Sequence, residues 1–170
     1  MKRISQEIIE RTRHRIDSMN PAEAPQIVSL MSQEQPVLLA YLLSAGEEDF
    51  NEEEKELLLY AGIMIWQIMK EGAGPLPPVS EGSFLEAENR NTAMLEYLDL
   101  EPERDFRKTI RLIFENYNQL EVLKFAIQLV LEEEDPCPIR EDNRGLMIYY
   151  LKNVIDSFEI ENRRSNSTGP

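Results

Sequence analysis

The run LLLYAGIMIWQIM, residues 57–69, is the feature that most limits how this chain can fold, because Gln67 is its one polar side chain. A helix that crosses a bilayer needs about 20 predominantly apolar residues. The run is shorter than that, and the charged residues Glu56 and Lys70 stand directly before and after it. A helix that is apolar on all sides is expected where neighbouring helices surround it. We therefore expect residues 57–69 to form a central helix of a helical array.

Two further segments, residues 37–43 and 122–131, are nearly as apolar as this run. Three such helices in one chain predict a layered or bundled arrangement, with these helices in the middle and amphipathic ones outside. We expect Trp66 in the core, with its indole nitrogen bonded to a polar group. Gly62 is expected to let a neighbouring backbone approach closely. Whether a second chain covers one side of the run, as a dimer seam, stays open at this point.

Apolar residues recur at helical spacing along nearly the whole chain, and no stretch shows the alternation of a strand between hairpin turns. The clearest example is one face of the segment 106–117, which carries apolar side chains at every turn. We predict an all-α fold, a compact array of about seven to eight antiparallel helices. The predicted helices span residues 3–18, 22–33, 35–45, 52–71, 83–98, 103–118, 120–133 and 142–159.

The chain is expected to form a single all-helical domain over residues 1–159, with a disordered polar tail over 160–170. A Gly/Pro loop at 72–82 suggests two halves, 1–71 and 83–159. When the chain is shifted by 85 residues, the order of elements in the halves matches, although few residues are identical. The halves are therefore either a pseudo-repeat or the chance echo that any antiparallel helical array produces.

The chain carries 32 acidic and 18 basic residues, a net charge of −14. Such a charge repels nucleic-acid backbones, so nucleic acid is not an expected partner. The first fifteen residues are locally basic, and we attribute this to an acidic neighbour within the protein rather than to a lipid surface. The single cysteine cannot form an internal disulfide, and the N-terminal residues lack the apolar stretch of a secretory signal. We expect a cytoplasmic protein with no membrane partner.

One acidic cluster has the spacing of a metal site. Glu52, Glu53 and Glu56 place carboxylates on one face at the start of a helix, where they could hold a magnesium ion. All-α nucleotide pyrophosphatases use such a motif together with a second acidic pair on the next helix. Glu96 and Asp99 are the only candidates for that pair, and they lie beyond the Gly/Pro loop at the wrong spacing. The alternative interpretation is an acidic first turn that the helix dipole favours.

Other reactive side chains are sparse in this sequence. His14 is the only histidine, which excludes the paired histidines of di-iron bundles, and Cys137 lies between prolines with no nearby base to activate it. The acidic turns at 46–54 and 131–136 do not fit an EF-hand loop and are interpreted as helix ends that could also bind a basic partner. There is no glycine-rich phosphate loop. Catalytic residues are therefore unknown, and no metal ligand or cofactor is assigned.

Two functions are consistent with these patterns. The first is a non-enzymatic helical protein–protein interaction or regulatory module, whose partner is either a second copy in a homodimer or a basic protein. The alternative is a magnesium-dependent nucleotide or phosphate hydrolase that uses Glu52, Glu53 and Glu56. An acidic decoy of nucleic acid is a third hypothesis, but it rests on the net charge alone.

Overall fold

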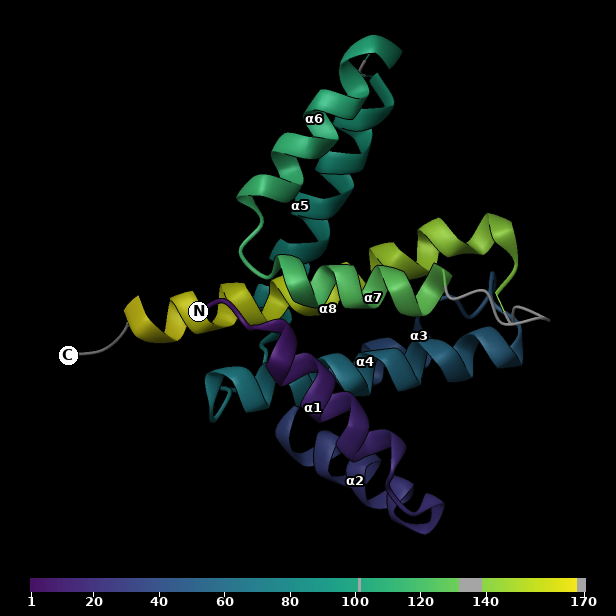
Figure 1. The fold of residues 1–170 in the computed structure, drawn as a ribbon, viewed down its shortest axis with the longest axis vertical. Coiled ribbons are helices and arrows are strands. Elements are labelled where there is room, and N and C mark those ends of the chain that lie inside the picture. The colour runs from purple at the N-terminus through teal and green to yellow at the C-terminus, as the bar shows by residue number, and fades with distance from the viewer. Residues whose placement is uncertain (101, 132–138, 168–170) are drawn as a thin grey trace.

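The computed structural model describes residues 1–100, 102–131 and 139–167, except for the side chains of 21 and 103–107. Within these ranges the chain contains α-helices, one short 3-10 helix and no strand (Figure 1). The predicted all-α array of seven to eight helices is confirmed, whereas its antiparallel order and the repeat between halves stay predictions. The elements are α1 (Gln6–Asp17), η1 (Pro21–Glu23), α2 (Ala24–Glu34), α3 (Pro36–Ser44), α4 (Glu52–Ala73), α5 (Glu81–Leu100), α6 (Glu103–Asn116), α7 (Leu120–Leu131) and α8 (Glu141–Ser167).

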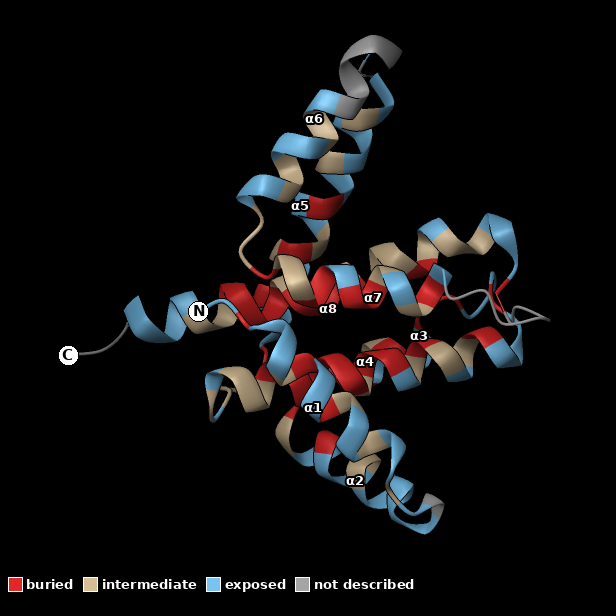
Figure 2. Ribbon diagram, in the orientation of Figure 1, coloured by how far each residue is buried: buried red, intermediate tan, exposed pale blue. Residues whose placement is uncertain are grey.

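The core lies where α4 and α8 cross the middle of the molecule, as the buried segments in Figure 2 show. Helices α1, α2, α3 and α7 contact α4, and α5 and α7 contact α8. Trp66 of α4 is 0% exposed. The predicted central position of the run 57–69 is therefore confirmed, and neighbours from the same chain enclose Trp66. No helix in the described ranges has the length and apolar character needed to cross a bilayer.

Two expectations about α4 need correction at the level of single atoms. The indole nitrogen of Trp66 has no hydrogen-bond partner among the described residues, although Lys70 Nζ lies 5.3 Å from the ring centroid. The group that approaches Gly62 is a side chain and not a backbone. A Cβ added at Gly62 would lie 2.4 Å from Leu42 Cδ1, so the glycine makes the space into which α3 inserts Leu42.

The last helix, α8, is longer than the pattern predicts. The sequence predicts a disordered tail from residue 160, but α8 continues to Ser167. Ile160 is 4% exposed, and the Glu161 carboxylate accepts hydrogen bonds from the backbone N–H and the hydroxyl of Ser80 at 2.9 and 2.6 Å. The expectation of disorder is therefore wrong for 160–167, because tertiary contacts hold a segment that is polar in sequence. Residues 168–170 lie outside the described residues.

The basic N-terminal region lies against acidic residues of the same chain, as expected from its charge. Arg15 Nε donates to Glu71 Oε1 of α4 at 2.8 Å, and Arg11 pairs with the same carboxylate. Ahead of α1, the N-terminal amine lies 3.6 Å from Glu159 of α8. These contacts tie the N-terminal segment to both central helices.

Helices α5 and α6 form an arm that projects from the body (Figure 1). Helix α5 packs on α8, and its four buried side chains, Ser83, Phe84, Ala87 and Asn91, lie between its start and its middle. Beyond Asn91, none of the described side chains of α5 or α6 is buried, and Figure 2 colours the described part of the outer arm as exposed or intermediate. The arm is thus anchored at its base and uncovered towards its tip.

Candidate functional site

One face of α4 is only partly covered by the rest of the chain. Leu59 and Ile63 are half-buried and Tyr60 is exposed, although Trp66 on the same helix is enclosed. These side chains lie on the wall of a groove of about 340 Å³ between α4, the end of α1 and α2. The groove is lined by Ile16, Met19, Asn20, Ala24, Ile27, Val28, Glu56, Leu59, Tyr60 and Ile63.

The local sequence explains why a groove forms here. Helix α1 ends at Asp17, and the chain turns through η1 before α2 begins, with a proline, Pro25, in its first turn. The residues that α2 and α4 contribute recur three or four positions apart, so each helix presents one apolar face to the groove. Tyr60 Oη donates to Asp17 Oδ1 at 2.8 Å, which ties the end of α1 to α4 across the groove.

The charges around the groove are mainly acidic. Glu56 lines it directly, and Glu23 is exposed immediately before Ala24. Asp17 is bonded to Tyr60 and also pairs with Arg13 at 3.4 Å. An apolar floor with carboxylates at its edge is suited to bind the apolar side of a cationic, amphipathic segment.

The predicted metal cluster is not brought together. Glu52 and Glu53 are exposed, Glu52 pairs with Lys55 at 3.1 Å, and Glu56 turns towards the groove. Among the described residues, no group of three histidine, cysteine or acidic side chains is placed to hold a metal ion. The interpretation of this turn as a helix start is supported, because Asn51 and Glu54 form a capping box at the beginning of α4.

Glu54 is the acidic residue in this turn that the structure singles out. Its side chain is fully buried and accepts hydrogen bonds from Arg140 Nη2 at 2.7 Å, the Arg140 backbone N–H at 2.9 Å and Asn143 Nδ2 at 3.0 Å. Burial alone would raise the pKa of Glu54, but the hydrogen bonds from Arg140, Asn51 and Asn143 outweigh it and lower that pKa to about 2. The cluster joins the segment before α8 to the start of α4, so it has a structural role.

The spacing of Asn51 and Glu54 is the sequence signal that could have identified this residue, because it matches a capping box. Nothing local points to Arg140, which is 86 positions away. The groove has no single motif either, since three separate helices line it.

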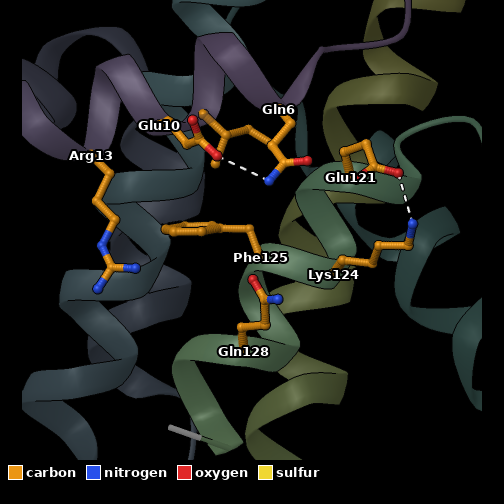
Figure 3. Close-up of a pocket in the computed structure, with 8 residues that line it drawn as sticks. Gln6, Glu10, Arg13, Glu121, Lys124, Phe125 and Gln128 are labelled. Atoms are coloured by element: carbon orange, nitrogen blue, oxygen red, sulfur yellow. Dashed lines mark hydrogen bonds and ion pairs between the residues drawn. The ribbon is translucent and has the colours of Figure 1, made fainter.

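A second pocket of about 320 Å³ lies between α1 and α7 (Figure 3). Ile9 and Phe125 are its buried residues, and its polar side chains are exposed or half-buried. Two polar pairs form within single helices: Gln6 donates to Glu10 at 2.9 Å, and Lys124 donates to Glu121 at 2.8 Å. These groups satisfy one another near solvent, so the pocket is a weaker candidate than the groove.

A polar cluster fastens the arm to α8. Lys152 Nζ donates to Asp156 Oδ2 at 2.5 Å and to Asn91 Oδ1 at 2.7 Å, and Tyr117 Oη donates to Asp156 Oδ1 at 2.6 Å. Burial, and then the Asp156 charge, raise the pKa of Tyr117 well above its usual value, which keeps its hydroxyl protonated as a donor. Because the members satisfy one another, we assign the cluster to anchoring and not to catalysis.

The remaining candidates from the sequence do not add to the groove. His14 is exposed in the last turn of α1. Cys137 and most of the acidic turn 131–136 lie outside the described residues. In the other acidic turn, the Asp49 carbonyl accepts a hydrogen bond from Arg140, so part of that turn belongs to the Glu54 cluster. Comparisons of the chain with protein-family models, curated proteins and solved structures each gave no match.

Proposed function

We propose that this protein is a non-enzymatic helical interaction module, which binds a basic, amphipathic helical segment of a protein partner in the groove between α1, α2 and α4. The observation that carries the proposal is the partly exposed apolar face of the central helix, formed by Leu59, Tyr60 and Ile63, which lines the groove. Grooves with apolar walls and a few polar groups at the edge are the usual form of a binding site.

The shape of the groove favours a helical ligand. Recognition of an amphipathic helix uses anchor side chains at i, i+3, i+4 and i+7, which enter a hydrophobic groove. A volume of about 340 Å³ is within the size range of binding pockets, although a docked helix would leave part of its surface in solvent. Aliphatic side chains from three helices supply the apolar walls.

The acidic edge favours a basic ligand over an acidic one. Glu56 and Glu23 would face cationic side chains on the partner, and like charges there would oppose binding. Charges at the edge of an interface mainly affect association rate and specificity, whereas the apolar contacts supply most of the affinity.

The direct test uses a fluorescein-labelled Leu/Lys amphipathic peptide about five helical turns long, with a Leu/Glu peptide of the same pattern as its counterpart. We expect fluorescence anisotropy to show the Leu/Lys peptide binding at least about tenfold more tightly than the Leu/Glu peptide. Equal affinity for both peptides would contradict the acidic-edge argument.

A matched pair of variants locates the binding. Ile63→Glu places a charge in the groove and should weaken Leu/Lys peptide binding by about tenfold or more. Leu43→Glu introduces the same change on α3, where Leu43 is 62% exposed and does not line the groove, and should leave binding unchanged. If both variants bind like the unmodified protein, the peptide is held elsewhere on the acidic surface and the groove proposal fails.

A further inference from the structure

The outer part of the arm presents a second uncovered surface, separate from the groove. We call residues 92–100 of α5 and 108–116 of α6 the distal arm. Leu95, Leu100 and Leu112 are 48%, 86% and 49% exposed, respectively. A hollow of about 440 Å³ lies beside α5 here, lined by Leu95, Glu96, Leu98 and Asp99.

Two helices by themselves provide little burial for their apolar side chains. Residues Ile110, Ile113 and Phe114 form one face of α6, yet each is only half-buried. By contrast, at the base of the arm Phe84 and Ala87 are buried where α5 packs on α8. A pair of helices gains a full core when a second pair packs on it, as in a four-helix bundle.

The charges on the distal arm indicate what that second pair is. Glu96 and Asp99 are exposed on α5, which has no basic residue between 92 and 100. Lys108 and Arg111 are exposed on α6, with Glu115 as the only acidic residue between 108 and 116. One helix of the surface is acidic and the other is mainly basic. A two-fold axis would place the acidic α5 of each copy against the mainly basic α6 of the other copy. Two equivalent contacts form in this way, so the surface is complementary to itself.

We propose that a second copy of this chain covers the distal arm, with the two arms pairing into a four-helix unit in which α5 of each copy faces α6 of the other. Leu95, Leu100 and Leu112 then enter the shared interface, and Glu96 and Asp99 face the partner's Lys108 and the partner's Arg111. This contact is independent of the groove and leaves both grooves accessible.

Charge reversal gives a sharp test by analytical ultracentrifugation. The unmodified protein should sediment as a dimer at micromolar concentration. Glu96→Lys with Asp99→Lys makes α5 basic, and Lys108→Glu with Arg111→Glu makes α6 acidic, so each double variant alone should dimerise at least about tenfold more weakly. Mixed together, the two variants restore both α5–α6 contacts and should form a one-to-one heterodimer.

Several outcomes would overturn the proposal. A monomeric mass for the unmodified protein would show that a second copy does not cover the distal arm. Dimers of unchanged strength in both double variants, or no heterodimer on mixing well-folded variants, would exclude the α5–α6 pairing. Circular dichroism checks folding, and Leu100→Glu is a second disrupting change if a double variant misfolds. Ile63→Glu in the groove should leave the dimer intact. The peptide-binding test and the dimerisation test can therefore fail independently of each other.

Discussion

At the residue scale, Glu54 makes the unfolding free energy of the protein depend on pH. Its pKa in the folded protein is about 2, against 4.5 for an unperturbed glutamate. Because the folded pKa is lowered, the stabilisation is complete above about pH 4.5 and is lost as the pH falls towards 2. The shift corresponds to about 3 kcal/mol of unfolding free energy.

We therefore expect Glu54→Gln to reduce the unfolding free energy at pH 7 by about 3 kcal/mol, and to flatten its dependence on pH between 4.5 and 2. Urea denaturation at a series of pH values measures both effects. Glu53→Gln, one position earlier and exposed, is the matched control and should change stability by less than about 0.5 kcal/mol. Equal losses in both variants would mean that the Glu54 cluster contributes nothing specific.

Gly62 makes a second prediction at this scale. Alanine at this position gains about 1 kcal/mol in helix propensity, but its Cβ would lie 2.4 Å from Leu42 Cδ1 in a buried contact. Overpacking typically costs about 1–3 kcal/mol, so Gly62→Ala should be destabilising by about 1 kcal/mol.

A double-mutant cycle separates the two contributions at Gly62. In a Leu42→Ala background the clash is absent, so Gly62→Ala should become stabilising when unfolding is measured in urea. If the substitution has the same effect in both backgrounds, contact with Leu42 is not the reason for glycine here.

At the element scale, α8 depends on contacts beyond the end that its apolar pattern predicts. Ile160 is buried, Glu161 accepts two hydrogen bonds from Ser80 and Arg164 donates to Glu86 at 2.6 Å. Truncation after Glu159 should therefore lower the unfolding free energy by about 2 kcal/mol, chiefly through loss of the buried isoleucine. Thermal melting by circular dichroism measures this effect, and truncation after Ser167, which removes no described residue, should leave the melting temperature unchanged.

At the scale of the whole molecule, the groove and the distal arm are separate surfaces on different helices. Changes at distant sites with no shared partners usually act additively. We expect Ile63→Glu to weaken peptide binding without changing the sedimenting mass, and Leu100→Glu to weaken dimerisation without changing peptide affinity. Anisotropy and sedimentation on the same preparations test both. A cross-effect in either direction would show that the two surfaces are coupled.

Much of the fold was accessible from local patterns. The eight predicted helices are present because apolar spacing and Pro/Gly breaks are properties of neighbouring residues. The central position of residues 57–69 followed from their apolarity on all sides. The pattern failed at residues 160–167, where a polar segment is helical because Ser80 and Glu86 bind it.

The proposed binding surfaces could not be located from the sequence, because their position depends on how the helices cross. The run 57–69 of α4 is apolar on all sides in the sequence, yet α1 and α2 cover its Leu59–Ile63 side only in part. No local pattern distinguishes that side from the enclosed one. The spacing of a magnesium site pointed to Glu52, Glu53 and Glu56. The structure instead buries Glu54, which is bonded to Arg140 from 86 positions away in the chain. Periodicity within a helix establishes which residues share a face. Contacts between helices decide which face is covered, because they join residues that are far apart in the chain.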